Sequence, residues 1–335
     1  MKSNYDEFPI DMVYLWCNGQ DPDFIKKKEK YERNSSNDSS NILSTGDIRF
    51  FDNDELKYSL RSLEKNAPWI NHIFIVTDRQ VPKWLNTTNT KVTIIDHSEI
   101  MPLSIIPCFN SSVIERYIGF IPNLQEHFLY GNDDTFLGEP VEPSFFFSNG
   151  KPIVRLLHFN KDHKSYEHEN LHNLKKEVSF WGNSVINAWN LLFSNYHLSE
   201  SIIYETHHNI DSFTKSSYCE CFYRFQEKLD ANINRFRSVN DIQRVLFSID
   251  SILQNQAVPK VLHEYSKIRK YLFWAKKLNV ESYYIQDKFK SLLALSFIHP
   301  KLFCINNSDR IDPRDKKYEK IFLEHRFPIK SNFEL

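Results

Sequence analysis

Two short stretches of the sequence hold residues whose types and spacing could do chemistry. The first is Asn132-Asp133-Asp134, which follows a run rich in Phe, Leu and Tyr that is typical of a buried strand. Two adjacent carboxylates beside an amide suit a divalent cation that keeps part of its water and also touches a phosphate. Because Asn and Asp also favour ordinary turns, the tripeptide by itself leaves a plain turn equally open.

The second stretch is the pair His207-His208, in the polar sequence THHNID. Histidine is the commonest general base near neutral pH, although a lone histidine on an apolar face is usually structural. Two adjacent histidines beside Asp211 shift that balance toward function. Further along, the sequence RFRS ends in Arg237-Ser238, and a planar guanidinium group can engage two phosphate oxygens at once.

The elements that must position these residues alternate between strands and helices. Expected strands cover residues 9–16, 72–77, 91–96 and 126–130, and expected helices cover residues 24–33 and 53–65. Asn18 and Asp21 follow the first strand, and Asp78 follows the second. Since ligands of open α/β sheets gather beyond the carboxyl ends of strands, these side chains are expected near one another. An ordinary strand-to-helix connection remains the alternative for the first turn.

The pattern changes after Gly138. Helices are expected at about residues 181–193, through Phe225 and from about Val239 to Leu253, and a strand at 303–307 precedes a last helix at 314–325. We therefore predict an α/β fold: a Rossmann-like, mostly parallel sheet with helices on both faces and a helical insertion in the C-terminal half. A single domain, residues 1–335, would consist of an α/β core at 9–138, a largely helical part at 139–300 that carries His207 and Arg237, and a strand and helix at 301–335 that return to the core.

Composition excludes several classes of protein. The 335 residues are 41% hydrophobic and 15% aromatic, which is ample for a packed core. The net charge of −1 gives no attraction to nucleic acid, so we expect no nucleic-acid partner. The five cysteines lack zinc-finger or thioredoxin spacing, and the seven glycines form no phosphate-binding loop. Because no apolar run approaches the ~20 residues of a membrane span, we expect a cytoplasmic protein, with peripheral attachment to the inner face of a membrane left open.

Several segments of the chain resemble the Stealth family of sugar-phosphate transferases. They are, in chain order, IDMVYLWCNGQDP (10–22), RFFDNDELKYSLRSLEKNAPWINHIFIVTD (49–78), FNSSVIE and FLYGNDDTFLG (within 109–138), RFRSVNDIQ (235–243) and CINNSDR with FLEHRFPIKSNFE (within 304–334). The family includes bacterial capsular and cell-surface polysaccharide phosphotransferases and the animal lysosomal-enzyme N-acetylglucosamine-1-phosphotransferase. The first segment departs from the family at Cys17, where valine is usual.

The resemblance implies an enzyme that transfers an intact sugar phosphate. The donor would be a UDP-sugar, and a hexose-1-phosphate or N-acetylhexosamine-1-phosphate would move to a hydroxyl of an oligosaccharide or lipid-linked glycan acceptor. The products would be a phosphodiester, for capsular or cell-surface polysaccharide, and UMP. Residues 9–138 would then bind the nucleotide sugar, and the resemblance also implies Mg²⁺ or Mn²⁺, which suits diphosphate chemistry.

The resemblance also assigns roles to single residues. The expected catalytic residues are His207, His208, Arg237, Glu115 and Asp134. His207 would be the base that takes the acceptor proton, with its neighbour His208 as second candidate, and Arg237 would hold the phosphate. Asp133 and Asp134 are the expected metal ligands. The expected substrate-binding residues are Asn18, Asp21, Arg49, Asp78, Asn110, Asn132, Asp309 and Arg326. A lone arginine such as Arg49 also fits a solvated surface charge.

Two alternative functions are also compatible with part of the sequence. A metal-dependent glycosyltransferase that releases UDP would use Asn132-Asp133-Asp134 as its metal motif, but it gives no role to His207 or to the RFRS stretch. A non-catalytic glycan-binding subunit would use Trp and Tyr side chains as sugar platforms. A binding surface of that kind needs no combination of acidic, histidine and arginine residues.

Overall fold

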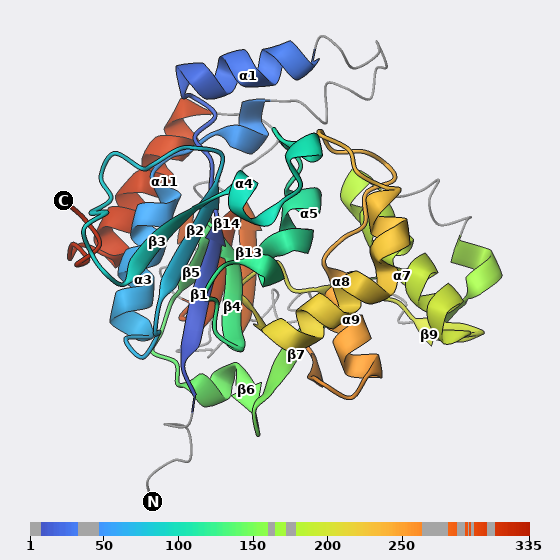
Figure 1. The fold of residues 1–335 in the computed structure, drawn as a ribbon. Helices are drawn as coiled ribbons and strands as arrows, with labels where there is room; N and C mark the ends of the chain where they lie inside the picture. Colours follow the sequence, from blue (N-terminus) through green and yellow to red (C-terminus); the bar gives the residue numbers. More distant parts are fainter. Residues whose placement is uncertain are drawn as a thin grey trace, which may run out of the picture.

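The core of the protein is a five-stranded sheet with the strand order β11-β4-β1-β2-β3 (Figure 1). The computed structural model describes residues 8–32, 47–159, 165–171, 179–262, 281–286, 292–293, 295, 298–306 and 312–335. The strands of this sheet are β1 (Ile10–Leu15), β2 (Ile73–Thr77), β3 (Val92–Asp96), β4 (His127–Asn132) and β11 (Asp211–Thr214). The first four are parallel, and β11 runs antiparallel to β4. The predicted mostly parallel, Rossmann-like sheet is thus confirmed.

Both faces of the sheet are buried by helices, because side chains alternate along each strand. On one face, Met12 and Tyr14 share a core with Leu56 and Leu60 of α3 (Glu55–Asn66). On the other face, Val13 belongs to the core formed with α8 (Lys215–Asp230) and α9 (Val245–Leu253). Full burial of one such side chain contributes about 1.5–3 kcal/mol.

Further helices and strands make up the rest of the described chain. The other helices there are α1 (Pro22–Glu32), η1 (Asp47–Phe50), α4 (His97–Ile100), η2 (Leu103–Ile105), α5 (Ser111–Ile114), η3 (Glu115–Phe120), η4 (Pro143–Phe145), η5 (His168–Asn170), α7 (Phe180–Tyr196) and α11 (Pro313–Arg326). The other strands there are β5 (Thr135–Leu137), β6 (Phe147–Ser148), β7 (Lys151–His158), β8 (Ser165–Glu167), β9 (Glu200–Ile202), β10 (Tyr204–Thr206), β12 (Val258–Val261), β13 (Ser282–Gln286) and β14 (Leu302–Asn306).

The C-terminal half contains the predicted helical insertion, formed by α7, α8 and α9. Strands run through it as well, since β7 pairs with β10 and β12, and β11 joins the main sheet. Within the described residues of the part at 139–300, the structure is therefore mixed rather than largely helical. The helix expected from Val239 begins only at Val245. The preceding residues form a turn in which the Asp241 carboxylate accepts the Ser238 N–H at 2.8 Å, so the backbone there is held out of the helix.

The C-terminal segment packs back onto the core. Strand β14 pairs antiparallel with β5 and parallel with β13. Phe136 of β5, Phe303 of β14 and Phe327 after α11 stack on one another in a separate small core. Arg61 of α3 donates to the carboxylate of Glu334 at 2.7 Å, which fixes the last residues against α3.

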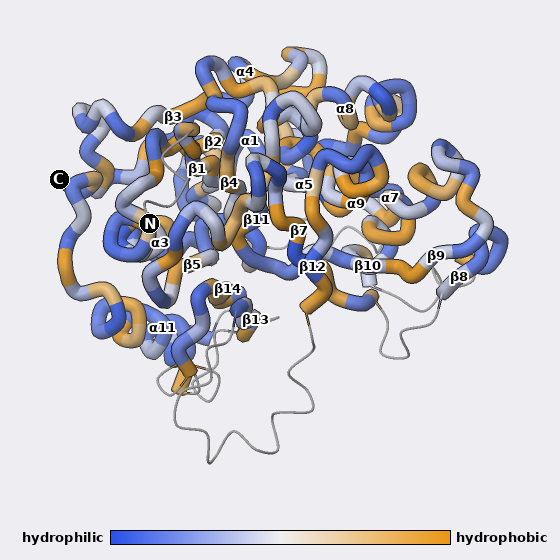
Figure 2. The backbone as a smooth tube through the Cα atoms, turned by 90° about the horizontal axis from the view of Figure 1, so that it is seen from below, coloured by the Kyte–Doolittle hydropathy of each residue, from blue (hydrophilic) through white to orange (hydrophobic). Residues whose placement is uncertain are grey.

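Apolar residues gather at the sheet, whereas much of the hydrophilic helix α11 lies at the periphery (Figure 2). Across the described part of the chain, every helix is either too short or too polar to traverse a lipid bilayer.

Candidate active site

The polar residues predicted at strand ends meet at the carboxyl edge of the main sheet, which lies below α1 in Figure 1. Strands β1 and β4 are neighbours, with Leu15 opposite Asn132. The chain adds β2 and β3 on one side of β1 and then returns to add β4 on the other side. Open α/β sheets bind ligands at such a reversal of strand order. Asn18 follows β1 there, and Asp133 follows β4.

The turn after β4 holds an unusually dense group of acidic side chains. Burial and the charges of Asp134, Glu55 and Asp52 raise the pKa of Asp133 well above its usual range. Burial also raises the pKa of Asp134 and that of Asp52, each to about 7, with Glu55 contributing to both. The Oδ1 atom of Asp134 is shielded from solvent and has no hydrogen-bond partner within the described ranges. Shielded carboxylates in such numbers are stable only with added protons or a cation.

One nitrogen and one sulfur atom lie beside these carboxylates. Ligand atoms of Asp134, His208 and Cys304 all lie within 4.8 Å of one another. The Cys304 thiol donates a hydrogen bond to Asp134, and burial raises its pKa well above the usual range. Burial, together with the charges of Arg244 and Arg237, lowers the pKa of His208 to about 4. The donor set therefore fits a divalent cation: carboxylates, with an imidazole that is neutral at pH 7.

Two arginines from distant segments face the same edge. Arg237 donates from Nη2 to the Ser111 hydroxyl at 2.9 Å. Partial desolvation at the rim and the nearby guanidinium group of Arg237 lower the pKa of Arg49 to about 10. Two neighbouring guanidinium groups attract an anion between them, and their planar shape matches the oxygens of a phosphate.

A buried ionic network lies under the site and includes a residue that the sequence did not single out. The guanidinium group of Arg244 lies 3.0 Å from Glu115 Oε2 and 2.6 Å from Asp211 Oδ2. It also lies over the ring of Tyr130, 4.4 Å from its centre. Burial would raise the pKa of Asp211, but the charges of Arg244 and His207 outweigh burial and lower it. No local pattern marks Arg244, because only the addition of β11 beside β4 brings its two partners together.

Both predicted histidines are at the site but in different surroundings. His207 is buried, with Nε2 3.0 Å from Asp211 Oδ1 and Nδ1 2.8 Å from the hydroxyl oxygen of Ser282. His208 is half-buried, and its ring packs edge-on against Tyr284 at 5.3 Å. Sequence reasoning noted Asp211 beside the two histidines without giving it a role, and it missed Ser282.

Other predicted substrate-binding residues instead hold the scaffold. Asn110 is fully buried and donates from Nδ2 to the carbonyls of Asn234 and Phe236 and to Asp241, so it fixes the loop that carries Arg237. This differs from the expectation that Asn110 lines the pocket, because its amide is used entirely within the protein.

The predicted substrate-binding residues in and beside the turn after β1 also form hydrogen bonds and ion pairs within the protein. The Asp21 carboxylate accepts N–H groups of the first turn of α1 at 2.9 and 3.0 Å, so it caps that helix. Asn18 exchanges hydrogen bonds with Gln80 through its backbone. Asp78 lies 2.7 Å from Lys27 of α1, and this ion pair holds α1 across the edge of the sheet.

Two further predicted residues do not reach the edge. Arg326 donates to the carbonyl of Gly138 at 2.6 Å and to Glu139 at 3.0 Å, at the end of β5 that points away from Asp134. It therefore anchors α11 rather than lining the site. Asp309 lies outside the described residues.

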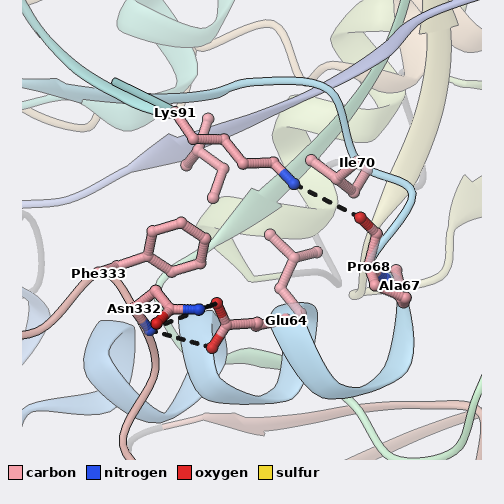
Figure 3. Close-up of a pocket in the computed structure, with 9 residues that line it drawn as sticks. Glu64, Ala67, Pro68, Ile70, Lys91, Asn332 and Phe333 are labelled. Carbon is pink, nitrogen blue, oxygen red and sulfur yellow. Dashed lines mark hydrogen bonds between the residues drawn. The ribbon is translucent and has the colours of Figure 1, made fainter. Parts of the chain in front are cut away.

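A cavity of about 280 Å³ lies at the opposite, amino edge of the sheet (Figure 3). The residues that line it are mostly apolar, and the polar ones among them form hydrogen bonds within the protein. Glu64 accepts from the Asn332 amide at 2.8 Å, and Lys91 donates to the carbonyl of Pro68 at 3.4 Å (Figure 3). Nothing in this cavity matches the residues predicted for catalysis.

Comparison with known proteins identifies the family of this chain. Stealth protein conserved region 1 matches residues 8–36, and conserved region 2 matches residues 49–154. The chain is 33% identical over 317 residues to the capsular polysaccharide phosphotransferase LcbA of Aeromonas hydrophila, covering 92% of this chain and 82% of that protein. It is 32% identical over 304 residues to the capsular polysaccharide phosphotransferase fcs1 of Haemophilus influenzae, covering 90% and 78%.

The chain belongs to the Stealth family. It is accordingly an enzyme of the phosphotransferase class, with a role in bacterial capsular or exopolysaccharide synthesis. Solved structures are more distant: the inositol-1-phosphate CTP transferase from T. maritima aligns with a TM-score of 0.37 and 10% identity, covering 94% of this chain and 96% of that chain. A likeness of that degree carries no argument about function.

Proposed function

We propose that this enzyme transfers a hexose-1-phosphate or N-acetylhexosamine-1-phosphate from a UDP-sugar to a hydroxyl of an oligosaccharide or lipid-linked glycan, forming a phosphodiester and releasing UMP. The observation that carries the proposal is the meeting of Arg237, His207-His208 and Asp133-Asp134 at one edge of the sheet. Transfer at phosphorus needs the reacting groups to be positioned and the charge on the phosphate oxygens to be neutralised. This combination of cations, imidazoles and carboxylates supplies both.

The sugar-linked phosphate is bound by arginine. Arg237 engages two of its oxygens, and Arg49 supplies a second positive charge at the rim. Asn110 is a positioning residue, since its buried amide holds the loop on which Arg237 lies. Ser111 keeps the Arg237 side chain turned toward the edge by accepting its hydrogen bond.

His207 is the base for the hydroxyl that attacks phosphorus. Asp211, 3.0 Å away, stabilises the imidazolium that forms when His207 takes the proton. His208 is the second candidate because it is half-buried, but a pKa of about 4 makes it a weak base. His207→Ala is expected to abolish transfer and to leave donor binding, measured by calorimetry, largely intact. Near-wild-type turnover of this variant would move the role to His208.

Asp133 and Asp134 are the residues that would hold Mg²⁺ or Mn²⁺. The shielded and unpartnered Oδ1 of Asp134, and the repulsion that raises the pKa of Asp133, support this assignment. When bound, the cation neutralises charge on the oxygens of the diphosphate. Asn132, half-buried at the end of β4, accepts a hydrogen bond from the Tyr130 hydroxyl at 3.0 Å, and its amide NH₂ group is the part that would contact the donor.

A glycosyltransferase that releases UDP is the competing function, because the same carboxylates would serve its metal. The two differ in the bond that breaks. We would incubate the enzyme with a panel of UDP-sugars, Mg²⁺ and a glycan acceptor, then record ³¹P NMR spectra and identify the nucleotide released. A phosphodiester signal with UMP supports the proposal, whereas UDP and a product without phosphorus contradict it.

A cytoplasmic setting, at the inner face of the membrane when the acceptor is lipid-linked, is part of the proposal. Cell fractionation followed by immunodetection tests it.

A further inference from the structure

The hydroxyl group of Ser282 is arranged to give its proton to His207. Nε2 of His207 lies 3.0 Å from Asp211 Oδ1 without the alignment of a hydrogen bond, and the charge of that carboxylate favours the tautomer with the proton on Nε2. Nδ1 then carries a lone pair, and Ser282 Oγ lies 2.8 Å from it. Nδ1 therefore accepts and the serine O–H donates.

Asn209 completes this chain of hydrogen bonds. Its Nδ2 lies 3.3 Å from the backbone carbonyl of Tyr283, which only accepts, so the NH₂ group of the amide faces this side. The same NH₂ group donates to Ser282 Oγ at 2.9 Å. With one lone pair of the oxygen engaged by Asn209, the serine proton is free to point at His207. Hydrogen bonds in this direction, from the serine O–H to a histidine nitrogen, prepare a serine for deprotonation.

Burial and register place Ser282 where a donor can reach it. His207 and Asp211 are only 2% and 5% exposed, whereas Ser282 is half-buried. On β13, Ser282 lies opposite Leu302 and Tyr284 lies opposite Cys304, the thiol that donates to Asp134. Two residues of a strand span roughly 7 Å, so Ser282 lies about that far along the sheet from the level of Cys304. Its link to the acidic turn runs through His207, which it contacts, and the adjacent His208, which lies beside Asp134.

A second contact shows that this face of β13 belongs to the site. Side chains two apart in a strand point to the same face. On that face Ser282 contacts His207, and Tyr284 packs against His208. His208 in turn is close enough to Arg237 for the charge of that arginine to lower its pKa. The serine, the paired histidines and the phosphate-binding arginine thus border one space.

We propose that Ser282 is a covalent nucleophile, so that transfer proceeds by two displacements at phosphorus. This inference rests on the proposed function. In the first step Ser282 Oγ forms a bond to the sugar-linked phosphorus of the UDP-sugar while the bond from that phosphorus to the UMP oxygen breaks. His207 takes the serine proton, and UMP leaves with the bonding pair. The enzyme then carries a sugar-phosphoserine diester.

The second step reverses the first with a different hydroxyl. The imidazolium of His207 loses its proton to solvent after UMP leaves. The acceptor hydroxyl then attacks phosphorus, its proton passes to His207, and the bond from phosphorus to Ser282 Oγ breaks. Ser282 recovers its proton from His207. The sum is UDP-sugar plus acceptor giving phosphodiester plus UMP and one proton, so atoms and electrons balance.

Stereochemistry at phosphorus tests the proposal without any variant. The donor on which transfer has been established would be made with one configuration of sulfur at the sugar-linked phosphorus, and the configuration of the phosphorothioate diester product would be determined. Two in-line displacements give net retention, which is the expected result. Inversion means one displacement and overturns the covalent role of Ser282, while the proposed function stands. Release of UDP instead of UMP would overturn the proposed function itself.

Trapping the intermediate locates the residue. The wild-type enzyme, mixed with donor in the absence of acceptor and quenched in acid, is expected to release about one UMP per enzyme in a burst and to gain the mass of one sugar phosphate on the peptide containing Ser282. Ser282→Ala is expected to lose the adduct and at least about 10³-fold of transfer. Ser201→Ala, which removes a hydroxyl that donates to the carbonyl of Ile202, is the control and should retain both. Wild-type transfer by a folded Ser282→Ala variant would overturn the proposal.

Discussion

Buried aspartates lie at both edges of the main sheet, but their neighbours act on their pKa values in opposite directions. At the amino edge, Asp11 is fully buried and accepts from Asn71 Nδ2 and the Gln125 N–H, both at 2.8 Å. Burial raises the pKa of Asp11, and each of its neighbours acts to lower it. At the carboxyl edge, burial also raises the pKa of Asp133, but there the neighbouring carboxylates raise it further.

The difference shows at which edge the protein supplies hydrogen-bond partners for its own buried carboxylates. A buried polar group is stable when its partners are present. The amino edge supplies those partners from its own chain, as it does for Glu64 and Lys91 beside the cavity there. At the carboxyl edge, Lys316 lies 3.5 Å from Glu55, but Asp133 and Asp134 still lie beside other carboxylates, and a metal ion would balance that charge.

Loss of Arg244 should have the largest effect on stability. Arg244→Met leaves Glu115 and Asp211 buried without their cation, so the free energy of unfolding should fall by about 3–5 kcal/mol. Lys91→Met at the amino edge removes a solvent-exposed contact and should stay within about 0.5 kcal/mol. Urea denaturation measures both. Equal losses of unfolding free energy in the two variants would contradict the proposed difference between the two edges.

Neutralising one aspartate at each edge should give opposite signs. Asp134→Asn is expected to lower transfer by about 10²–10³-fold, because a group that balances developing charge is lost, and to raise the melting temperature of the metal-free enzyme by relieving repulsion. Asp11→Asn should instead cost about 1–3 kcal/mol of stability, because it disrupts a paired buried carboxylate, with turnover per folded molecule unchanged. Steady-state assays and calorimetry report the two quantities. A stabilised Asp11→Asn variant would contradict the comparison.

The carboxyl edge should also make stability depend on pH. Asp52 and Asp134 have pKa values of about 7 in the folded chain, against about 4 when unfolded. Between those values the folded state binds protons that the unfolded state releases, so the metal-free protein should lose stability as pH rises from 5 to 8. Mn²⁺ or Mg²⁺ should restore it at pH 8. Thermal melts in EDTA and in each cation check this, and a melting temperature insensitive to both pH and cation would refute it.

The smallest effect is expected at the amino-edge cavity. Glu64→Gln keeps a hydrogen-bond acceptor for Asn332 and should change stability by less than about 0.5 kcal/mol and transfer not at all. The same assays apply. A clear loss of transfer would mean that this cavity takes part in the reaction.

The sequence predicted the elements that depend on local pattern. Apolar runs in a repeating strand–helix order indicate a parallel sheet, and each of the four parallel strands falls within two residues of its expected range. The strand-end position of Asp133-Asp134 followed from the same pattern, since the residue after a strand is fixed by where the strand stops. The turn at Asp241 was missed because a side chain distant in sequence, Asn110, helps to hold it.

Sequence alone thus determined the fold class, the family and the edge at which the chemistry lies. Only the tertiary structure decided which polar side chains hydrogen-bond within the protein and which still have an atom that can bind a ligand. Asp21 carries the same group as Asp134, yet Asp21 accepts backbone N–H groups of α1, whereas Oδ1 of Asp134 has no hydrogen-bond partner among the described residues. The pairing of Arg244 with Glu115 and Asp211, and of His207 with Ser282, joins segments up to 129 and 75 residues apart. Contacts of that range depend on how the strands assemble, and no local preference of the chain encodes them.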